Sequence, residues 1–198
     1  LLSGEGSDEI HGSYRYFRLA PNELEFYLET RRVLSELHHF DNLRVDRTAG
    51  AHGLEVRIPF LDNAYVSLVA STPVHELMYR EDQMEKQLLR DSFKGYLPDS
   101  LLYRSKEAFS DAVSGGVNWI SRLSAHAEEM VSDEVWSRMK EEPGFPPPGR
   151  EAAYYRMIFE SFYPKKSFLS IIPHYWMPRF QPEGSTISDP SATVLSCY

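Results

Sequence analysis

The sequence has 198 residues, of which 42% are hydrophobic and 25% charged, a composition typical of a globular domain with a sizeable core. Its formal charge of −8 argues against a general nucleic-acid surface, although a local basic pocket for a nucleotide is compatible with it. The single cysteine, Cys197, excludes an intrachain disulfide and suits a reducing compartment, and without a long apolar run we expect no membrane insertion.

The N-terminal segment is expected to leave a buried strand through a tight turn into a helix. Leu1 and Leu2 are typical of the end of a strand, and two glycines within residues 3–6 permit the turn. Ser7 is the predicted N-cap, followed by two carboxylates where the positive end of a helix favours them. Because Leu1 is not an initiator methionine, we expect either a fragment or a processed chain, and we favour the fragment.

Helices are predicted over most of the remaining chain. The first begins at Pro21-Asn22, and its apolar residues recur at helical spacing, which predicts a buried face. These residues are Leu24, Tyr27, Leu28, Leu34 and Leu37. Asp62 is a predicted cap for the helix that runs to Ser71. The other expected helices cover residues 40–51, 84–93, 117–131, 133–140 and 150–162, with a short helical turn after Pro98.

Several segments are predicted to interrupt these helices. Residues 104–116 are polar and end in two glycines, and the proline-rich run 143–149 cannot be helical. Residues 54–62 are too short to decide between a strand and an extended loop. Residues 164–198 form a tail rich in proline and serine. Taken alone, this pattern indicates an α-rich globular domain.

Residues 3–9, Ser-Gly-Glu-Gly-Ser-Asp-Glu, carry the strongest chemical signal in the sequence. Ser3, Gly4 and the following amides could line a nucleotide site at the end of a strand, the usual ligand position in open α/β sheets. Glu5 can serve as acid, base or acceptor, and Asp8 could bind the Mg²⁺ that accompanies ATP phosphates. The plain alternative is an ordinary turn followed by helix-dipole carboxylates. Spacing alone does not decide between them.

A resemblance to the asparagine synthetase family rests on motifs that follow one another along the whole chain. They begin with residues 3–9, Gly12-x-Tyr14-x-Tyr16-Phe17 and Ala20-Pro21. The central ones are Asp41-x-x-Arg44-x-Asp46-Arg47, the run 52–62, Glu85-Lys86-x-Leu88-Leu89-Arg90 and the loop 104–111. The last ones resemble the animal-type C-terminus and lie in residues 154–160, 174–178 and 189–192. Their common order makes the set far more specific than any one motif.

The resemblance implies an α/β parent fold, the ATP pyrophosphatase or adenine-nucleotide α-hydrolase-like fold, of which this chain holds the helical C-terminal part. Residues 1–163 would belong to the synthetase domain and residues 164–198 to the tail. The family activates the side-chain carboxylate of aspartate with ATP, giving an aspartyl adenylate and pyrophosphate. Ammonia from glutamine, made by a separate N-terminal domain, then releases asparagine and AMP. ATP and Mg²⁺ are the implied cofactors.

The same resemblance assigns roles to individual residues. Ser3 and Gly4 match positions that contact the nucleotide, and Glu5 matches the glutamate tied to adenylate formation and to ammonia. Asp8 matches a carboxylate near Mg²⁺ and pyrophosphate. Lys106 matches a lysine that meets the phosphates. Without the resemblance, we would expect Lys106 to be an ordinary solvated lysine.

Asp41 and Arg44 are three residues apart on a predicted helix, so both can face one side. The resemblance places this pair in the active-site framework, near aspartate. Without the resemblance, two such residues would more often be read as a structural ion pair. His38 and His39 match no family requirement, and we expect them to be ordinary surface or core histidines.

Two parts of the family pattern do not occur in the sequence. A pyrophosphate loop of the type Ser-Gly-Gly-x-Asp-Ser is missing, because Ser114-Gly115-Gly116 lacks the aspartate, and the glutaminase domain is missing too. Cys197 cannot replace its N-terminal nucleophile. This chain alone is therefore expected not to make asparagine. Residues 141–150 and 181–188 also depart from the family, which affects local structure rather than chemistry.

Two alternatives stay open at this point. The chain could be a non-catalytic structural or binding remnant of a synthetase, or a relative that closes a β-lactam ring, which the animal-type motifs disfavour. For the synthetase we expect a cytosolic location, no nucleic-acid or membrane partner, and a possible homodimer.

Overall fold

The computed structural model describes residues 1–78, 82–106 and 119–181. The chain divides into two compact units. The first runs from Leu1 to Ser105 and takes in the segment that starts at Pro178, and the second runs from Lys106 to Met177. The predicted loop from residue 107 onward and the tail from residue 182 lie outside the described residues. The predicted division at residue 163 concerns the intact synthetase domain and stays a prediction.

The described residues are mostly helical, as predicted. Their β pairing consists of two isolated parallel bridges, Leu2 with Arg57 and Lys94 with Leu97. Of the described helices, none is long and apolar enough to cross a membrane. The helical character is therefore confirmed, and the α/β parent fold is compatible with it.

The first unit begins with extended backbone, as the two leucines predict. The amide of Ser3 donates to the carbonyl of Arg57 at 2.9 Å, and the amide of Arg57 donates to the carbonyl of Leu1 at 2.8 Å. The segment around Arg57, which the sequence left undecided, is therefore extended where it pairs with the N-terminus. A short 3₁₀ turn, η3 (Pro59–Leu61), follows it.

Gly6 governs the entry into helix α1 (Ser7–Ile10). Gly6, and not the predicted Ser7, is the N-cap, with φ of 82° in the left-handed region that favours glycine. Ser7 is instead the first helical residue and is buried. A Cβ at position 6 would collide with the side chain of Leu61. The turn is thus shaped by backbone conformation and close packing rather than by a serine cap.

Substituting Gly6→Ala is expected to lower the free energy of unfolding by about 2 kcal/mol, because a left-handed alanine is strained and Leu61 must move. Gly50→Ala is the matched control. Gly50 lies in a helix, and an added Cβ meets no atom within 4 Å, so a gain of up to about 1 kcal/mol is expected. Denaturant melts of the two variants check both signs. Equal stabilities would contradict the packing at Gly6.

Helix α2 (Glu23–Glu36) begins where predicted, because the Asn22 side chain accepts a hydrogen bond from the amide of Glu25 at 3.0 Å. The predicted buried face is wrong for α2 itself, although Leu37, directly after the helix, is buried. Leu24 is 62% exposed, whereas Phe26 is 1% exposed. The buried residues of α2 are Phe26, Glu29, Thr30 and Val33.

A glutamate can occupy the buried face of α2 because its charge is fully partnered. Glu29 accepts a hydrogen bond from the Tyr16 hydroxyl at 2.7 Å and pairs with Arg32 at 2.6 Å. Around it, the Phe17 ring lies 5.1 Å from that of Phe26 and 6.4 Å from that of Phe180. This aromatic cluster, rather than the leucines, selects which side of α2 faces inward.

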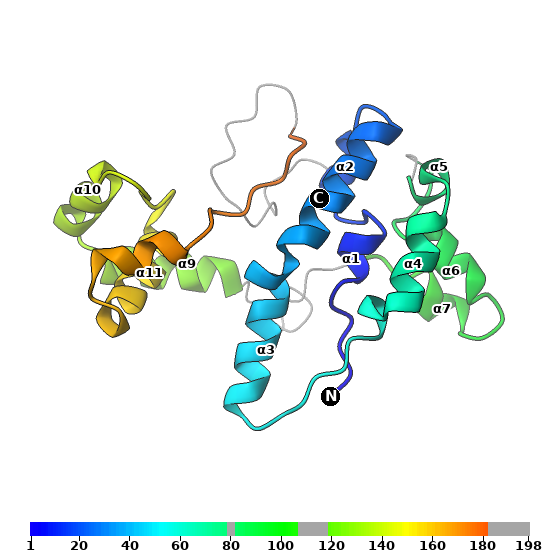
Figure 1. Cartoon of the computed structure of the whole chain (residues 1–198), viewed down its shortest axis with the longest axis horizontal. Helices are drawn as coiled ribbons and strands as arrows, with labels where there is room; N and C mark the ends of the chain where they lie inside the picture. The colour runs from blue at the N-terminus through cyan, green and yellow to red at the C-terminus, as the bar shows by residue number, and fades with distance from the viewer. Residues whose placement is uncertain (79–81, 107–118, 182–198) are drawn as a thin grey trace. The chain divides into compact units, whose positions relative to one another are not determined.

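Figure 1 shows α2 continuing toward α3 (Asp41–Ala51), with α1 beside α2. The predicted end of α3 is confirmed: Gly53 has φ of 67°, and the amide of Leu54 returns to the carbonyl of Ala49 at 3.0 Å. Helix α4 (Asn63–Ser71) is capped by Asp62, as predicted. The other helices of this unit are η1 (Arg15–Leu19), η2 (Leu37–His39), α5 (Val74–Leu77), α6 (Gln87–Ser92) and α7 (Asp99–Leu102).

Helix α6 is shorter than the predicted span 84–93. It starts at Gln87 because the preceding Lys86 has φ of 59°, a left-handed conformation that ends any helix arriving from the N-terminal side. Lys86 is the one non-glycine residue of the described chain with a positive φ. A strained residue of this kind is often found at a functional site.

The second unit contains α9 (Trp119–Met130), α10 (Asp133–Glu141), α11 (Arg150–Phe162) and the 3₁₀ helix η4 (Lys166–Ile171). Helices α9, α10 and α11 match the predicted spans closely, and the proline-rich run between α10 and α11 is non-helical, as predicted. The short η4 lies in the stretch expected to be a tail and was not predicted. Val131, Met139 and Ala153 form its buried core.

Candidate functional site

The turn that follows the extended N-terminal segment exposes backbone as well as side chains. The amide of Glu5 donates to the Ser3 hydroxyl at 3.3 Å, and the amide of Ser7 donates to the carbonyl of Gly4 at 3.3 Å. An added Cβ at Gly4 would meet no atom of the described chain within 4 Å. The backbone at Gly4 is thus open to close approach by a ligand.

Glu5 of the N-terminal turn comes together with Asp41 and Arg44, which are distant from it in the sequence and lie on helix α3. Arg44 Nη2 lies 3.3 Å from Glu5 Oε1 and 2.8 Å from Asp41 Oδ1, so one guanidinium joins the turn to helix α3. Burial raises the pKa of Glu5, and the nearby Arg44 opposes this shift. A carboxyl group with a raised pKa is better suited to exchange a proton near neutral pH.

Asp8, on helix α1, is held by two donors. The Ser13 hydroxyl donates to Asp8 Oδ1 at 2.6 Å, and Lys86 Nζ lies 2.8 Å from the same oxygen. Sequence reasoning quoted Lys86 as part of a motif but gave it no role. Because Lys86 lies next to Asp8, we include it in the candidate site. The one signal for Lys86 in the sequence is its place in that motif.

Glu9 is the most buried carboxylate of this corner, at 3% exposure. Its Oε1 accepts a hydrogen bond from the Tyr14 hydroxyl at 2.5 Å. Burial raises its pKa to about 7; the Tyr14 hydrogen bond lowers the pKa and the charge of Asp41 raises it. The sequence predicted a carboxylate in the first turn of a helix at this position but gave no signal that it is buried.

The fit of a divalent cation depends on Asp8. Among the residues that the structure describes, no cluster of three or more His, Cys, Asp or Glu side chains could hold a metal ion by itself. Mg²⁺ in nucleotide sites usually takes one or two carboxylates and completes its shell with phosphate oxygens and water. One hard carboxylate oxygen donor beside a turn with open backbone therefore fits a Mg²⁺ that arrives with a nucleotide.

Lys106 is the first residue of the second unit, and its side chain is half-buried. The predicted meeting of Lys106 with the turn at Glu5 stays a prediction. The adjacent histidines, His38 and His39, are exposed, and their ring centroids lie 3.8 Å apart with the planes tilted by 40°.

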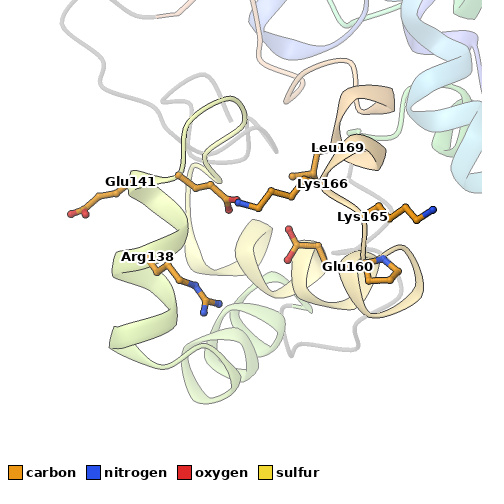
Figure 2. Close-up of a pocket in the computed structure, with 8 residues that line it drawn as sticks. Arg138, Glu141, Glu160, Lys165, Lys166 and Leu169 are labelled. Atoms are coloured by element: carbon orange, nitrogen blue, oxygen red, sulfur yellow. The ribbon is translucent and has the colours of Figure 1, made fainter.

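A pocket in the second unit has none of the predicted site residues in its lining. It has a volume of about 470 Å³ and is lined by Arg138, Glu141, Glu142, Glu160, Pro164, Lys165, Lys166 and Leu169 (Figure 2). Two of its carboxylates, those of Glu142 and Glu160, form ion pairs with basic residues of the same unit. The buried Arg156 pairs with Glu142 at 2.7 Å and with Glu160 at 2.8 Å, and Lys166 pairs with Glu142 at 2.8 Å. We interpret this network as structural.

This corner of the first unit thus combines an open turn after an extended segment, a carboxylate held by a lysine and a serine, and a second carboxylate with a raised pKa beside an arginine. The arrangement is compatible with a nucleotide-dependent ligase site. Comparison with known proteins is specific. The asparagine synthase family model matches residues 18–168, and the chain belongs to this family.

The curated relatives agree along the whole chain. A probable glutamine-hydrolysing asparagine synthetase of Acanthamoeba polyphaga mimivirus is 53% identical over 98% of this chain and 35% of its own length. The Gallus gallus asparagine synthetase is 45% identical over 100% of the chain and 35% of its length. That of Triphysaria versicolor is 45% identical over 87% of the chain and 30% of its length. The chain thus spans about a third of these relatives.

Proposed function

We propose that this chain supplies the C-terminal part of the synthetase domain of a glutamine-dependent asparagine synthetase. The main support for this proposal is that Arg44 contacts both Glu5 and Asp41, which joins two distant sequence motifs beside the turn at Gly4. A further motif adds Lys86 next to Asp8. Three family motifs therefore meet in one corner, as a composite active site requires.

In the proposed reaction, a side-chain oxygen of aspartate attacks the α-phosphorus of ATP, and the bond to the departing pyrophosphate breaks. The nitrogen of ammonia then attacks the acyl carbon of the adenylate. The bond to AMP breaks, and the nitrogen loses a proton as the amide forms. Each step needs stabilisation of negative charge on phosphate oxygens, and the second also needs a proton acceptor.

The residues of the chain divide these tasks. Ser3 and Gly4 present backbone to the nucleotide, and Arg44 with Asp41 provides a charge pair that can orient an amino acid. Glu5 would take the proton that ammonia releases, and its contact with Arg44 supports this role. Asp8 would hold Mg²⁺, which neutralises the pyrophosphate as it leaves.

The test is an isotope experiment on the full-length protein. Aspartate labelled with ¹⁸O in its side-chain carboxylate, ATP and glutamine should yield asparagine, pyrophosphate and AMP that carries one label. This transfer is specific for an acyl adenylate, since the attacking oxygen leaves with AMP. Release of ADP and phosphate, or unlabelled AMP, would contradict the proposal. The 198-residue chain alone serves as the blank and should form no asparagine.

Lys106→Ala in the full-length protein is expected to lower aspartate-dependent pyrophosphate release about tenfold, because a point charge on the phosphates is lost. Lys140→Ala is a suitable control, since Lys140 is an exposed lysine on α10. Release of pyrophosphate at the normal rate by Lys106→Ala would remove this residue from the site.

Location and assembly belong to the same proposal. We place the reaction in the cytosol, and we infer that the partners are small molecules and the glutaminase domain, with a homodimer as the expected assembly. Cell fractionation and sedimentation of the full-length protein measure these two points directly.

A further inference from the structure

Tyr14 lies between two carboxylates that come from different helices. Its hydroxyl donates to Glu9 Oε1 of α1 at 2.5 Å, and the single proton of the Tyr14 hydroxyl makes a second, longer contact of 3.4 Å to Asp41 Oδ2 of α3. The residue directly precedes η1, and its ring stacks on that of Tyr16 with 6.0 Å between centroids and 13° between planes. The stacked ring fixes where the hydroxyl can reach.

The carboxylate of Asp41 is therefore approached at both of its oxygens. Asp41 Oδ1 pairs with Arg44 at 2.8 Å, and Oδ2 faces the hydroxyl of Tyr14. Arg44 is largely exposed, with 64% of its side chain accessible. This ion pair by itself restrains Asp41 only weakly, because holding an exposed arginine in one geometry costs side-chain entropy. A contact from the more buried Tyr14 supplies the second fixed point.

We propose that Tyr14 is a positioning residue of the aspartate site, whose hydroxyl holds Asp41 in the orientation that Asp41 and Arg44 need to receive the substrate. This inference rests on the proposed function and deepens it. Tyr14 acts through Asp41 and does not itself contact the substrate. Small displacements of an orienting carboxylate are costly, because substrate orientation contributes strongly to rate and affinity.

Tyr16 provides a matched control for this role. Its hydroxyl also donates to a buried carboxylate, Glu29 Oε1 at 2.7 Å, but that carboxylate belongs to α2 and pairs with Arg32. Tyr14→Phe and Tyr16→Phe thus each remove a hydroxyl that donates a hydrogen bond to a buried carboxylate. Only Tyr14→Phe removes a contact to Asp41.

The measurement is steady-state synthesis by the full-length protein with aspartate and ATP varied separately. Tyr14→Phe should raise KM for aspartate about tenfold, the effect of losing one hydrogen bond to a charged group. KM for ATP should stay within about twofold, because the nucleotide contacts are assigned elsewhere. Tyr16→Phe should leave both KM values within about twofold of the parent, whatever its melting temperature, because its contacts point to α2.

A double variant separates positioning from a general structural effect. If Tyr14 acts through Asp41, then Tyr14→Phe added to Asp41→Asn should leave KM for aspartate within about twofold of Asp41→Asn alone. Effects that multiply would show that Tyr14 acts by another route and would overturn the inference.

The remaining outcomes distinguish the inference from the proposed function. If Asp41→Asn raises KM for aspartate and Tyr14→Phe does not, the role of Tyr14 is overturned and the proposed function stands. If Asp41→Asn has no effect, aspartate does not bind at this pair, and both assignments fall. If Tyr14→Phe does not fold, Glu9→Gln is the second variant: a neutral amide competes less for the single proton of Tyr14, so its contact with Asp41 should strengthen and KM for aspartate should stay the same or fall. A KM for aspartate raised about tenfold in that variant overturns the inference.

Discussion

Glu5→Gln in the full-length protein is expected to lower asparagine formation at least about a hundredfold, the range attributed to general acid–base groups. The amide keeps the shape of the side chain but cannot accept a proton from the attacking ammonia. It also removes the charge that Arg44 meets at 3.3 Å. Glutamine hydrolysis should continue, because the proposed glutaminase domain lies outside this chain. Separate assays of glutamate and asparagine measure the two activities.

A control for Glu5→Gln is available in the same unit. Glu55 pairs with Arg57, and both side chains are more than 70% exposed. Exposed pairs of this kind contribute little to stability, so Glu55→Gln should synthesise asparagine at nearly the parental rate. Synthesis at the parental rate by Glu5→Gln as well would show that the corner of Glu5 and Arg44 is not the reaction centre.

Asp8→Asn is the second substitution with a large expected effect, again about a hundredfold or more in asparagine formation, as expected when a charge-stabilising group of the site is lost. Its cause differs from that of Glu5→Gln. An amide is a weaker ligand than a carboxylate for a hard cation, so the variant should also need a higher Mg²⁺ concentration for half-maximal rate. A Mg²⁺ titration at saturating ATP separates this loss from a loss of proton transfer.

The local structure around Asp8 supplies the control. Ser13→Ala removes the hydrogen bond to Asp8 Oδ1 but leaves the carboxylate and its ion pair with Lys86 in place. A smaller loss of rate, less than about tenfold, is expected from one missing hydrogen bond. If Asp8→Asn shows the same Mg²⁺ dependence as the parent protein, Asp8 does not hold the ion. Melting curves of both variants test whether the corner stays folded.

Local signals in the sequence were sufficient for most helix boundaries. Asn22 and Asp62 cap the helices that follow them, and Gly53 ends the helix before it, as predicted. These signals succeed because a cap or a left-handed glycine acts on backbone groups within one turn of the chain. The ordered motifs also identified the family, since many short matches in the same order are specific even when each is weak.

The tertiary structure decided which groups are buried and which charges meet. It turned Phe26 inward instead of Leu24, because an aromatic cluster covers one side of α2. It buried Glu9 and placed Lys86 on Asp8, although the sequence separates that pair by 78 positions (86 − 8). The sequence by itself thus determined the family, the helices and the residue types at the corner. Which side chains touch, and how burial shifts their pKa values, depends on packing between distant segments, and only the folded chain brings those segments together.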